Sequence, residues 1–94
     1  MRESVIERYL HKRVTEAGGT TRKFTGRIHA PDRIVIWPGT SRAGHHVHFV
    51  ECKAPLKKAR PGQKREHTRL RALDCYVLVL DTKEMIDLYV ESWK

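Results

Sequence analysis

The sequence predicts an α/β domain. Three observations support this prediction: the order of helical and strand patterns, the spacing of apolar residues within them, and the length of the chain. The chain begins with an amphipathic helical pattern, three short strand patterns follow, and a helix, an apolar strand and a last helix complete the order. Apolar residues recur every three or four positions in the helical segments, whereas they alternate in the strand at 46–53. With 94 residues the chain has the size of one domain, so we expect residues 1–94 to form a single domain.

The first helix and the first strand are predicted within the first third of the chain. Residues 2–17 carry an apolar stripe at helical spacing, and the glycine pair at 18–19 ends the helix. Glu7 lies beside that stripe and is expected to lean toward the core. Residues 20–27 are predicted to form a strand, with Phe24 as its main core residue.

Two further strands are predicted at 32–37 and 46–53, separated by a turn that begins at Pro38. Successive side chains of a strand point to opposite faces, and side chains two apart lie about 6–7 Å from each other along one face. Glu51 and Lys53 therefore share a face, whereas Cys52 points away from it.

The remaining elements are a helix, a strand and a last helix. Proline residues flank the irregular segment 54–60, and Pro61 suits the first turn of a helix over 61–73. Residues 75–80 are continuously apolar, as expected for a strand that is covered on both faces. Residues 83–93 carry an apolar stripe at helical spacing and are predicted to form the final helix.

The net charge of +8 is concentrated in one segment. Residues 53–71 contain eight Lys or Arg and one acidic residue, so they carry +7, and the other 75 residues together carry +1. A basic run next to acidic residues is where an anionic polymer such as DNA would lie. The residues that we expect to bind DNA are Lys57, Lys58, Arg60, Lys64, Arg65, Arg69 and Arg71.

The two cysteines, Cys52 and Cys75, are interpreted as buried, reduced thiols. Both lie next to apolar strand residues, and the sequence has no signal peptide pattern and no apolar run long enough to span a bilayer. We therefore expect a cytoplasmic protein with no membrane partner.

Asp32 begins one predicted strand, and Glu51 and Lys53 end the next, so these three side chains are expected to meet. Two carboxylates can hold a hard divalent cation such as Mg²⁺ or Mn²⁺. A lysine beside them can act on a phosphate or on the attacking water. This is the chemistry that hydrolyses a phosphodiester bond.

The order and spacing of these residues resemble the PD-(D/E)xK nuclease superfamily and, within it, the VRR-NUC (virus-type replication-repair nuclease) domain of the stand-alone phage type. The resemblance rests on Glu7, Ala-Pro-Asp-Arg at 30–33, Phe-Val-Glu-Cys-Lys-Ala-Pro at 49–55, Gly-Gln-Lys at 62–64, the end of the helix at 70–73 and the strand at 76–80. It implies a restriction-endonuclease-like core, α-β-β-β-α-β with a C-terminal helix, in which helices flank a mixed sheet.

The resemblance also implies roles for individual residues. Asp32 and Glu51 would be metal ligands, joined by Glu7 and by the backbone carbonyl of Cys52; Glu3 and Glu16 are alternatives to Glu7 on the same helix. Lys53 would be catalytic, and Gln63 would hydrogen-bond a water, a phosphate or a catalytic carboxylate.

The sequence departs from the family pattern at two positions where glycine is frequent. One is His29, two residues before Pro31, and the other lies in the turn after the second helix, which reads Leu-Asp-Cys at 73–75. These departures concern the geometry of loops and leave every predicted catalytic group in place.

We therefore expect a homodimeric, Mg²⁺- or Mn²⁺-dependent DNA endonuclease that acts on branched DNA such as four-way (Holliday) junctions. Two sites related by a twofold axis would nick two strands. The apolar faces of the first and last helices are candidate dimer surfaces. The alternatives are a non-catalytic, basic nucleic-acid-binding module and a structural subunit whose basic face meets an acidic protein.

The histidines at 45, 46 and 48 do not have the spacing of a structural zinc site, and no cysteine completes one. They are interpreted as polar residues at the entry of a strand. Trp37 and Trp93 are interpreted as core or interface residues rather than as platforms for bases.

Overall fold

The computed structural model describes residues 2–39 and 46–94. The elements in this part of the chain are α1 (Glu3–Glu16), β1 (Thr20–Lys23), β2 (Arg33–Ile36), β3 (Val47–Cys52), α2 (Pro61–Ala72), β4 (Tyr76–Leu80) and α3 (Lys83–Trp93). The strands form one sheet in the order β1-β2-β3-β4. The β1/β2 and β2/β3 pairs are antiparallel and the β3/β4 pair is parallel, which confirms the predicted α/β class with a mixed sheet.

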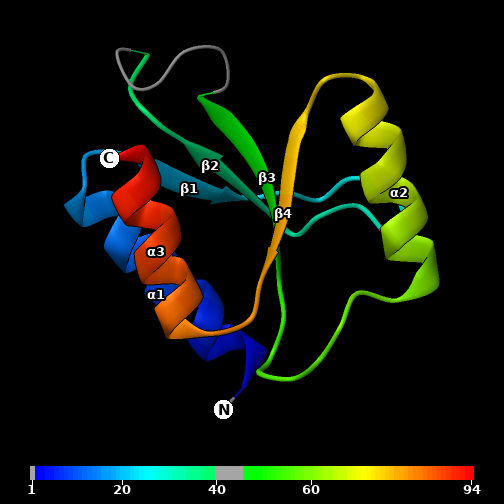
Figure 1. Cartoon of the computed structure of the whole chain (residues 1–94), viewed down its shortest axis with the longest axis horizontal. Helices are drawn as coiled ribbons and strands as arrows, with labels where there is room; N and C mark the ends of the chain where they lie inside the picture. Colours follow the sequence, from blue (N-terminus) through cyan, green and yellow to red (C-terminus); the bar gives the residue numbers. More distant parts are fainter. Residues whose placement is uncertain (1, 40–45) are drawn as a thin grey trace.

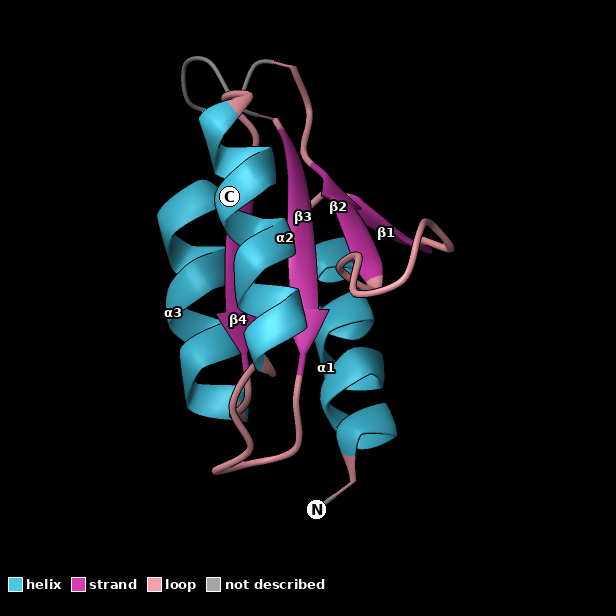
Figure 2. Ribbon diagram, turned by 90° about the vertical axis from the view of Figure 1, so that its right-hand side faces the viewer, coloured by secondary structure: helices cyan, strands magenta, loops and turns pink. Residues whose placement is uncertain are grey.

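Helices cover both faces of the sheet. Figure 1 shows α1 and α3 side by side on one face and α2 on the other, and Figure 2 shows α2 in front of β3 and β4. A parallel pair of strands needs a long connection between them, and α2 lies in the connection from β3 to β4. The predicted basic segment is therefore this crossover connection.

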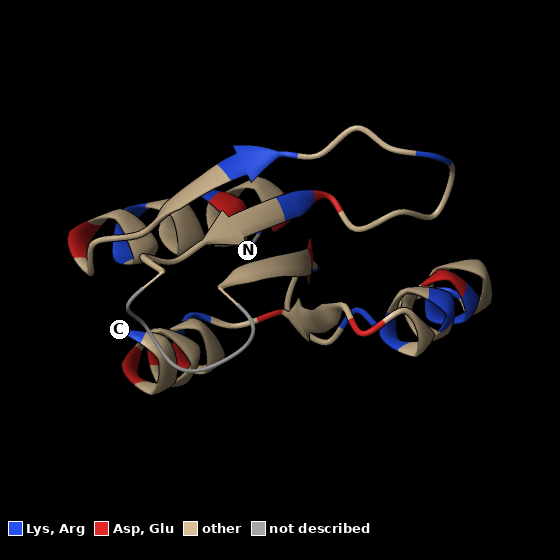
Figure 3. Ribbon diagram, turned by 90° about the horizontal axis from the view of Figure 1, so that it is seen from above, with Lys and Arg blue, Asp and Glu red and all other residues tan. Residues whose placement is uncertain are grey.

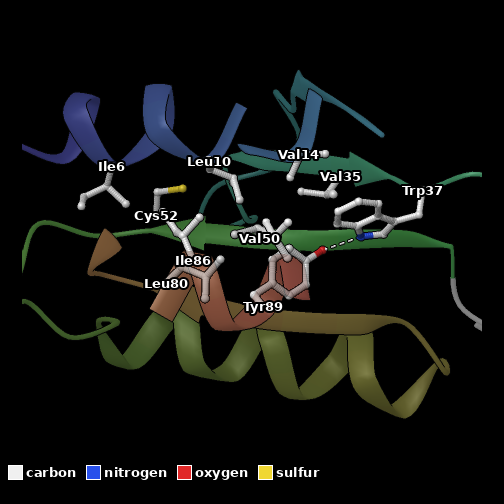
Figure 4. Close-up of a cluster of buried hydrophobic side chains, with 11 residues drawn as sticks. Ile6, Leu10, Val14, Val35, Trp37, Val50, Cys52, Leu80, Ile86 and Tyr89 are labelled. Atoms are coloured by element: carbon white, nitrogen blue, oxygen red, sulfur yellow. Dashed lines mark hydrogen bonds between the residues drawn. The ribbon is translucent and has the colours of Figure 1, made fainter. Parts of the chain in front are cut away.

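The hydrophobic core fills the space between the sheet and the α1/α3 layer (Figure 4). Ile6, Leu10 and Val14 come from α1, Ile86 and Val90 from α3, and all five are fully buried. The apolar faces of the first and last helices are thus used within the chain, so the expectation that they form dimer surfaces is wrong. Periodicity shows that a helix has an apolar face but not which surface covers it.

Two tryptophans and a histidine belong to the same core. The indole nitrogen of Trp37 donates to the Tyr89 hydroxyl at 3.0 Å, and Nδ1 of His48 lies 2.5 Å from that oxygen. The ring of Trp93 packs edge-on against His48, with 4.2 Å between centroids. Both tryptophans are therefore core residues, as interpreted, and His48 is a buried, partnered side chain. His46 is exposed, and position 45 lies outside the described residues.

Phe24 is not the core residue that the pattern predicted. β1 ends at Lys23, and the half-buried ring of Phe24 packs edge-to-face on Phe49, with 5.5 Å between centroids. Phe49 alternates with the core residue Val50 along β3 and so lies on the α2 face of the sheet. Fully buried Thr21 is the inward residue of β1 instead.

Within residues 2–39 and 46–94, three residues other than glycine have a positive φ: His29 (71°), Leu56 (68°) and Asp74 (66°). For an L-residue this conformation costs about 1 kcal/mol, and less for Asp, whose short side chain can bond locally. His29 and Asp74 occupy the two places where the family often has glycine. The backbone therefore adopts the conformation that glycine favours, even though the residue type differs.

Both cysteines are free thiols; Cys52 is buried in the core, as interpreted, whereas Cys75 is only half-buried because it lies just before β4 rather than within the sheet. No helix in the described part of the chain is both long and apolar enough to cross a membrane.

Candidate active site

Asp32 and Glu51 lie next to each other because β2 and β3 pair in antiparallel register. Arg33 pairs with Val50, which places Asp32, just before β2, opposite Glu51 near the end of β3. The backbone nitrogen of Cys52 donates to Oδ1 of Asp32 at 3.2 Å and fixes the orientation of that carboxylate. The thiol of Cys52 points the other way, into the core, where burial raises its pKa.

Glu3, rather than Glu7, completes the acidic cluster. Carboxylate oxygens of Glu3, Asp32 and Glu51 all lie within 4.8 Å of one another. The carboxylate of Glu7 is turned to Arg33, whose Nε donates to Oε1 at 3.0 Å. Glu7 remains close enough for its charge to raise the pKa of Asp32. Helical periodicity favours Glu7 because it borders the apolar stripe, whereas the first turn of α1 is what reaches the strand ends.

Lys53 and Gln63 both approach the same oxygen of Glu51. Nζ of Lys53 lies 3.7 Å from Oε2, and Nε2 of Gln63 donates to Oε2 at 3.3 Å. The other end of the Gln63 amide accepts the backbone N–H of Arg60 at 2.8 Å, so this side chain also caps α2. The glutamine is thereby held in one orientation, and the start of α2 is tied to the acidic cluster.

His67 is a site residue that the sequence pattern did not assign. It lies one turn after Gln63 on α2, only 2% exposed, and its Nε2 is 4.0 Å from the second oxygen of Glu51, Oε1. Neither of these two buried atoms has a hydrogen-bond partner among the described residues. Burial lowers the pKa of His67, and the charge of Arg71 lowers it further. The spacing of four from Gln63 was the only sequence signal for it.

Burial raises the pKa of both central carboxyl groups. The pKa of Asp32 rises to about 6 because of burial, against the lowering effect of the Cys52 N–H. The pKa of Glu51 rises to about 7, first because of burial and then because of the charge of Asp32. Oxygen donors crowded in this way repel each other unless a cation lies between them, and three carboxylates are ligands that Mg²⁺ and Mn²⁺ prefer. The residues present therefore fit a divalent cation.

Two cation-lined hollows flank the segment 54–60 beside the cluster. One, of about 560 Å³, is lined by Lys57, Lys58, Ala59, Lys64, His67, Thr68, Arg71, Val79, Asp81 and Met85. The other, of about 300 Å³, is lined by Glu3, Lys53, Ala54, Lys57, Lys58 and Arg60. Five of the predicted DNA-binding residues thus line a hollow near the carboxylates, and Figure 3 shows the basic residues along α2.

The other two predicted DNA-binding residues lie elsewhere on α2. The Arg69 guanidinium pairs with Glu66 at 2.8 Å, and Arg65 is exposed and lines neither hollow. Arg71 lines the larger hollow, but it also donates to the Val77 carbonyl at 2.8 Å. A structural contact thus accounts for part of the charge that the sequence pattern assigned to DNA binding.

Comparison with known proteins identifies the family. The fold matches that of a solved VRR_NUC domain with a TM-score of 0.80 and 34% sequence identity, over 95% of this chain and 94% of that one. The chain is also 44% identical over 87 residues to the protein named "Putative nuclease p44" of Acyrthosiphon pisum secondary endosymbiont phage 1, covering 90% of this chain and 88% of that protein. No family model matches the sequence. The agreement of fold, sequence and acidic cluster establishes that this chain belongs to the VRR-NUC family, within the PD-(D/E)xK nuclease superfamily.

Proposed function

We propose that this protein is a metal-dependent endonuclease that hydrolyses phosphodiester bonds in DNA. The observation that carries the proposal is the meeting of the Glu3, Asp32 and Glu51 carboxylates within 4.8 Å, with the Lys53 ammonium 3.7 Å from Glu51. The similarity to a solved VRR_NUC domain and to a phage protein named as a nuclease supports it. The cation-lined hollows beside the cluster suit a polyanionic substrate.

Each residue of the site has a distinct task in this proposal. Asp32, Glu51 and Glu3 would hold Mg²⁺ or Mn²⁺, together with the backbone carbonyl of Cys52. When bound, the ion supplies a Lewis acid for the phosphate oxygens and lowers the pKa of water. The Lys53 ammonium stabilises the negative charge that builds on the phosphate during attack. Gln63 donates to Oε2 of Glu51 and holds that oxygen in place, whereas the buried ring of His67 lies 4.0 Å from Oε1 without a hydrogen bond to it.

We further propose that the substrate is branched DNA and that the protein acts as a homodimer. One chain carries one acidic cluster among its described residues, whereas symmetric cutting of a four-way junction needs two sites. A twofold dimer supplies them in fixed relation. Because the apolar faces of α1 and α3 are buried within the chain, such a dimer must use other surfaces.

The direct test is a cleavage assay with the intact protein and its Lys53→Ala variant. Labelled four-way junction, flap, linear duplex and single-stranded DNA are incubated with EDTA, Mg²⁺ or Mn²⁺. We expect cutting only when Mg²⁺ or Mn²⁺ is present, and fastest cutting on the junction. The rate for Lys53→Ala should be about 10²- to 10³-fold lower, because the developing charge loses its partner. Lys94→Ala, which removes a surface lysine paired with Glu91, is the matched control and should cut normally.

Two outcomes would overturn the proposal. Cutting that persists in EDTA would exclude the metal-dependent reaction. Tight binding without cutting under any metal would instead identify a non-catalytic nucleic-acid-binding module.

The pair Glu3→Gln and Glu7→Gln tests which helix carboxylate serves the metal. We expect Glu3→Gln to raise the Mg²⁺ concentration for half-maximal cleavage about tenfold, because it removes one charged ligand from the cluster. Glu7→Gln should change this concentration less than threefold, since its carboxylate is bonded to Arg33. Mg²⁺ titration of the cleavage rate gives both values. A larger effect for Glu7→Gln would return the ligand role to Glu7.

A further inference from the structure

The turn that follows β3 and Lys53 holds Leu56 in a backbone conformation that leucine disfavours. The backbone N–H of Lys57 donates to the Ala54 carbonyl at 3.0 Å, which closes a four-residue turn with Pro55 second and Leu56 third. The φ of Leu56 is 68°, and a positive φ at the third position of such a turn calls for Gly or Asn. Residues in such conformations cluster at active sites and at segments that contact ligands.

The side chain of Leu56 has no packing role that would offset this strain. It is 93% exposed, the most exposed large apolar side chain in the described part of the chain. Two cations, Lys57 and Lys58, follow it directly, and Pro55 precedes it. An exposed apolar group beside two lysines suits a partner that offers both negative charge and an apolar face.

The position of the turn explains what this combination can recognise. Residues of the segment 54–60 line both hollows, and Lys57 and Lys58 are shared between them. The smaller hollow also contains Glu3 and Lys53 of the active site. Lysines line each hollow and can contact a phosphate backbone. Leu56 lines neither hollow, but it directly precedes the two lysines that the hollows share.

We propose that Leu56 is a wedge that contacts an unstacked base or base-pair face where two DNA strands part, and so determines preference for branched DNA. In a continuous duplex the bases are stacked on one another, and an apolar side chain gains little from contact. At a branch or a flap a base face is exposed, and insertion of an aliphatic side chain buries it. This inference rests on the proposed action on DNA, and it assigns the preference for shape to one side chain.

The test uses Leu56→Gly, Leu56→Ala and Leu56→Met, with Leu73→Ala as the matched control. Leu73 is also an exposed leucine (76%), but it follows the far end of α2, about 15 Å along the helix axis from Gln63. Binding is measured in EDTA to a four-way junction and to a linear duplex of the same length. The junction carries 2-aminopurine at the branch, whose fluorescence rises when the base unstacks.

We expect Leu56→Gly and Leu56→Ala to weaken junction binding about tenfold, to abolish the rise in fluorescence and to leave duplex binding within twofold. Leu56→Met and Leu73→Ala should behave as the wild type. Leu56→Gly should also raise the melting temperature by about 3 °C, because glycine relieves the strain at positive φ. A gain in stability with a loss of junction binding is a combination that a purely structural role does not produce.

Three results would overturn this role. One is wild-type junction binding by Leu56→Gly, and another is an equal loss on junction and duplex. The third is a change in molecular mass by light scattering, which would assign Leu56 to contact between two copies of the chain. A failure of the proposed nuclease function can be told apart from a failure of this role. Wild-type protein that never cuts DNA can still show a junction preference in EDTA that depends on Leu56.

Discussion

Replacing Asp32 with Asn, or Glu51 with Gln, is expected to lower the rate of DNA cleavage by at least about 10³-fold. Each change removes a charged oxygen from the centre of the cluster, where the cation must balance both the carboxylates and the phosphate. DNA binding in EDTA should stay within about twofold, because the cations that line the two hollows are untouched. Single-turnover cleavage with Mg²⁺ and binding in EDTA, measured on the same junction, give the two values. Full cleavage by either variant would contradict the assignment.

The same two variants should be more stable than the wild type in the absence of metal. The pKa of Asp32 is about 6 and that of Glu51 about 7 in the folded chain, both above the values of the unfolded chain. The folded state therefore binds more protons, and stability from the neutral carboxyls is fully present below about pH 4. It is lost as pH rises through about 6 and 7.

Melting temperatures in EDTA from pH 5 to pH 8 test this linkage. The wild-type value should fall relative to that of the Asp32→Asn, Glu51→Gln double variant as pH rises. Glu91→Gln, a change at an exposed carboxylate on α3, is the control and should follow the wild-type curve. Addition of Mg²⁺ at pH 8 should raise the melting temperature of the wild type and not that of the double variant. Parallel curves in EDTA would mean that the pKa values of these two carboxyl groups are not raised in the folded chain.

The Leu10→Ala variant is expected to lose about 2–5 kcal/mol of unfolding free energy. Leu10 is fully buried in the core between α1, the sheet and α3, and the truncated side chain leaves a cavity there. For a domain of this size the melting temperature should fall by about 10 °C or more. Urea denaturation followed by circular dichroism measures the change, with Leu88→Ala, at a 69% exposed site on α3, as the control. A loss below about 1 kcal/mol would show that α1 does not depend on this packing.

Loss of Leu10 should also reach the active site, because α1 carries Glu3 in its first turn. A loosened α1 holds that carboxylate less firmly against Asp32 and Glu51. At a temperature where the variant remains folded, its Mg²⁺ requirement should therefore rise in the same direction as that of Glu3→Gln.

The sequence predicts the elements of this fold well because each has a strong local signal. The observed α1, α2 and α3 differ from the predicted ranges by one residue or none at each end, and β2, β3 and β4 also start and end within one residue. Only β1 is much shorter than expected, since Phe24 and the residues after it leave the sheet. Aromatic and apolar content shows that a residue will be buried, but not on which side of a sheet.

The candidate site was predictable where it depends on strands and less so where it depends on helices. The alternation along β3 places Glu51 and Lys53 on one face, and two adjacent strand ends bring in Asp32. The choice between Glu3 and Glu7 depends on how far α1 extends past the strand ends, which no periodicity encodes. The exposure of Leu56 and the unpartnered pair formed by His67 and Glu51 depend likewise on the packed structure.

The crossover between β3 and β4 has a consequence for how this family can diversify. The loop 54–60, between β3 and α2, carries Leu56 and the two lysines that line both hollows, yet it contributes no side chain to the α1/α3 core cluster. Insertions and substitutions in such a loop cost little folding free energy, because loop closure depends only weakly on length. Substrate range can therefore evolve, or be engineered, by changes in the loop 54–60, while Asp32, Glu51, Lys53 and Gln63 stay unchanged.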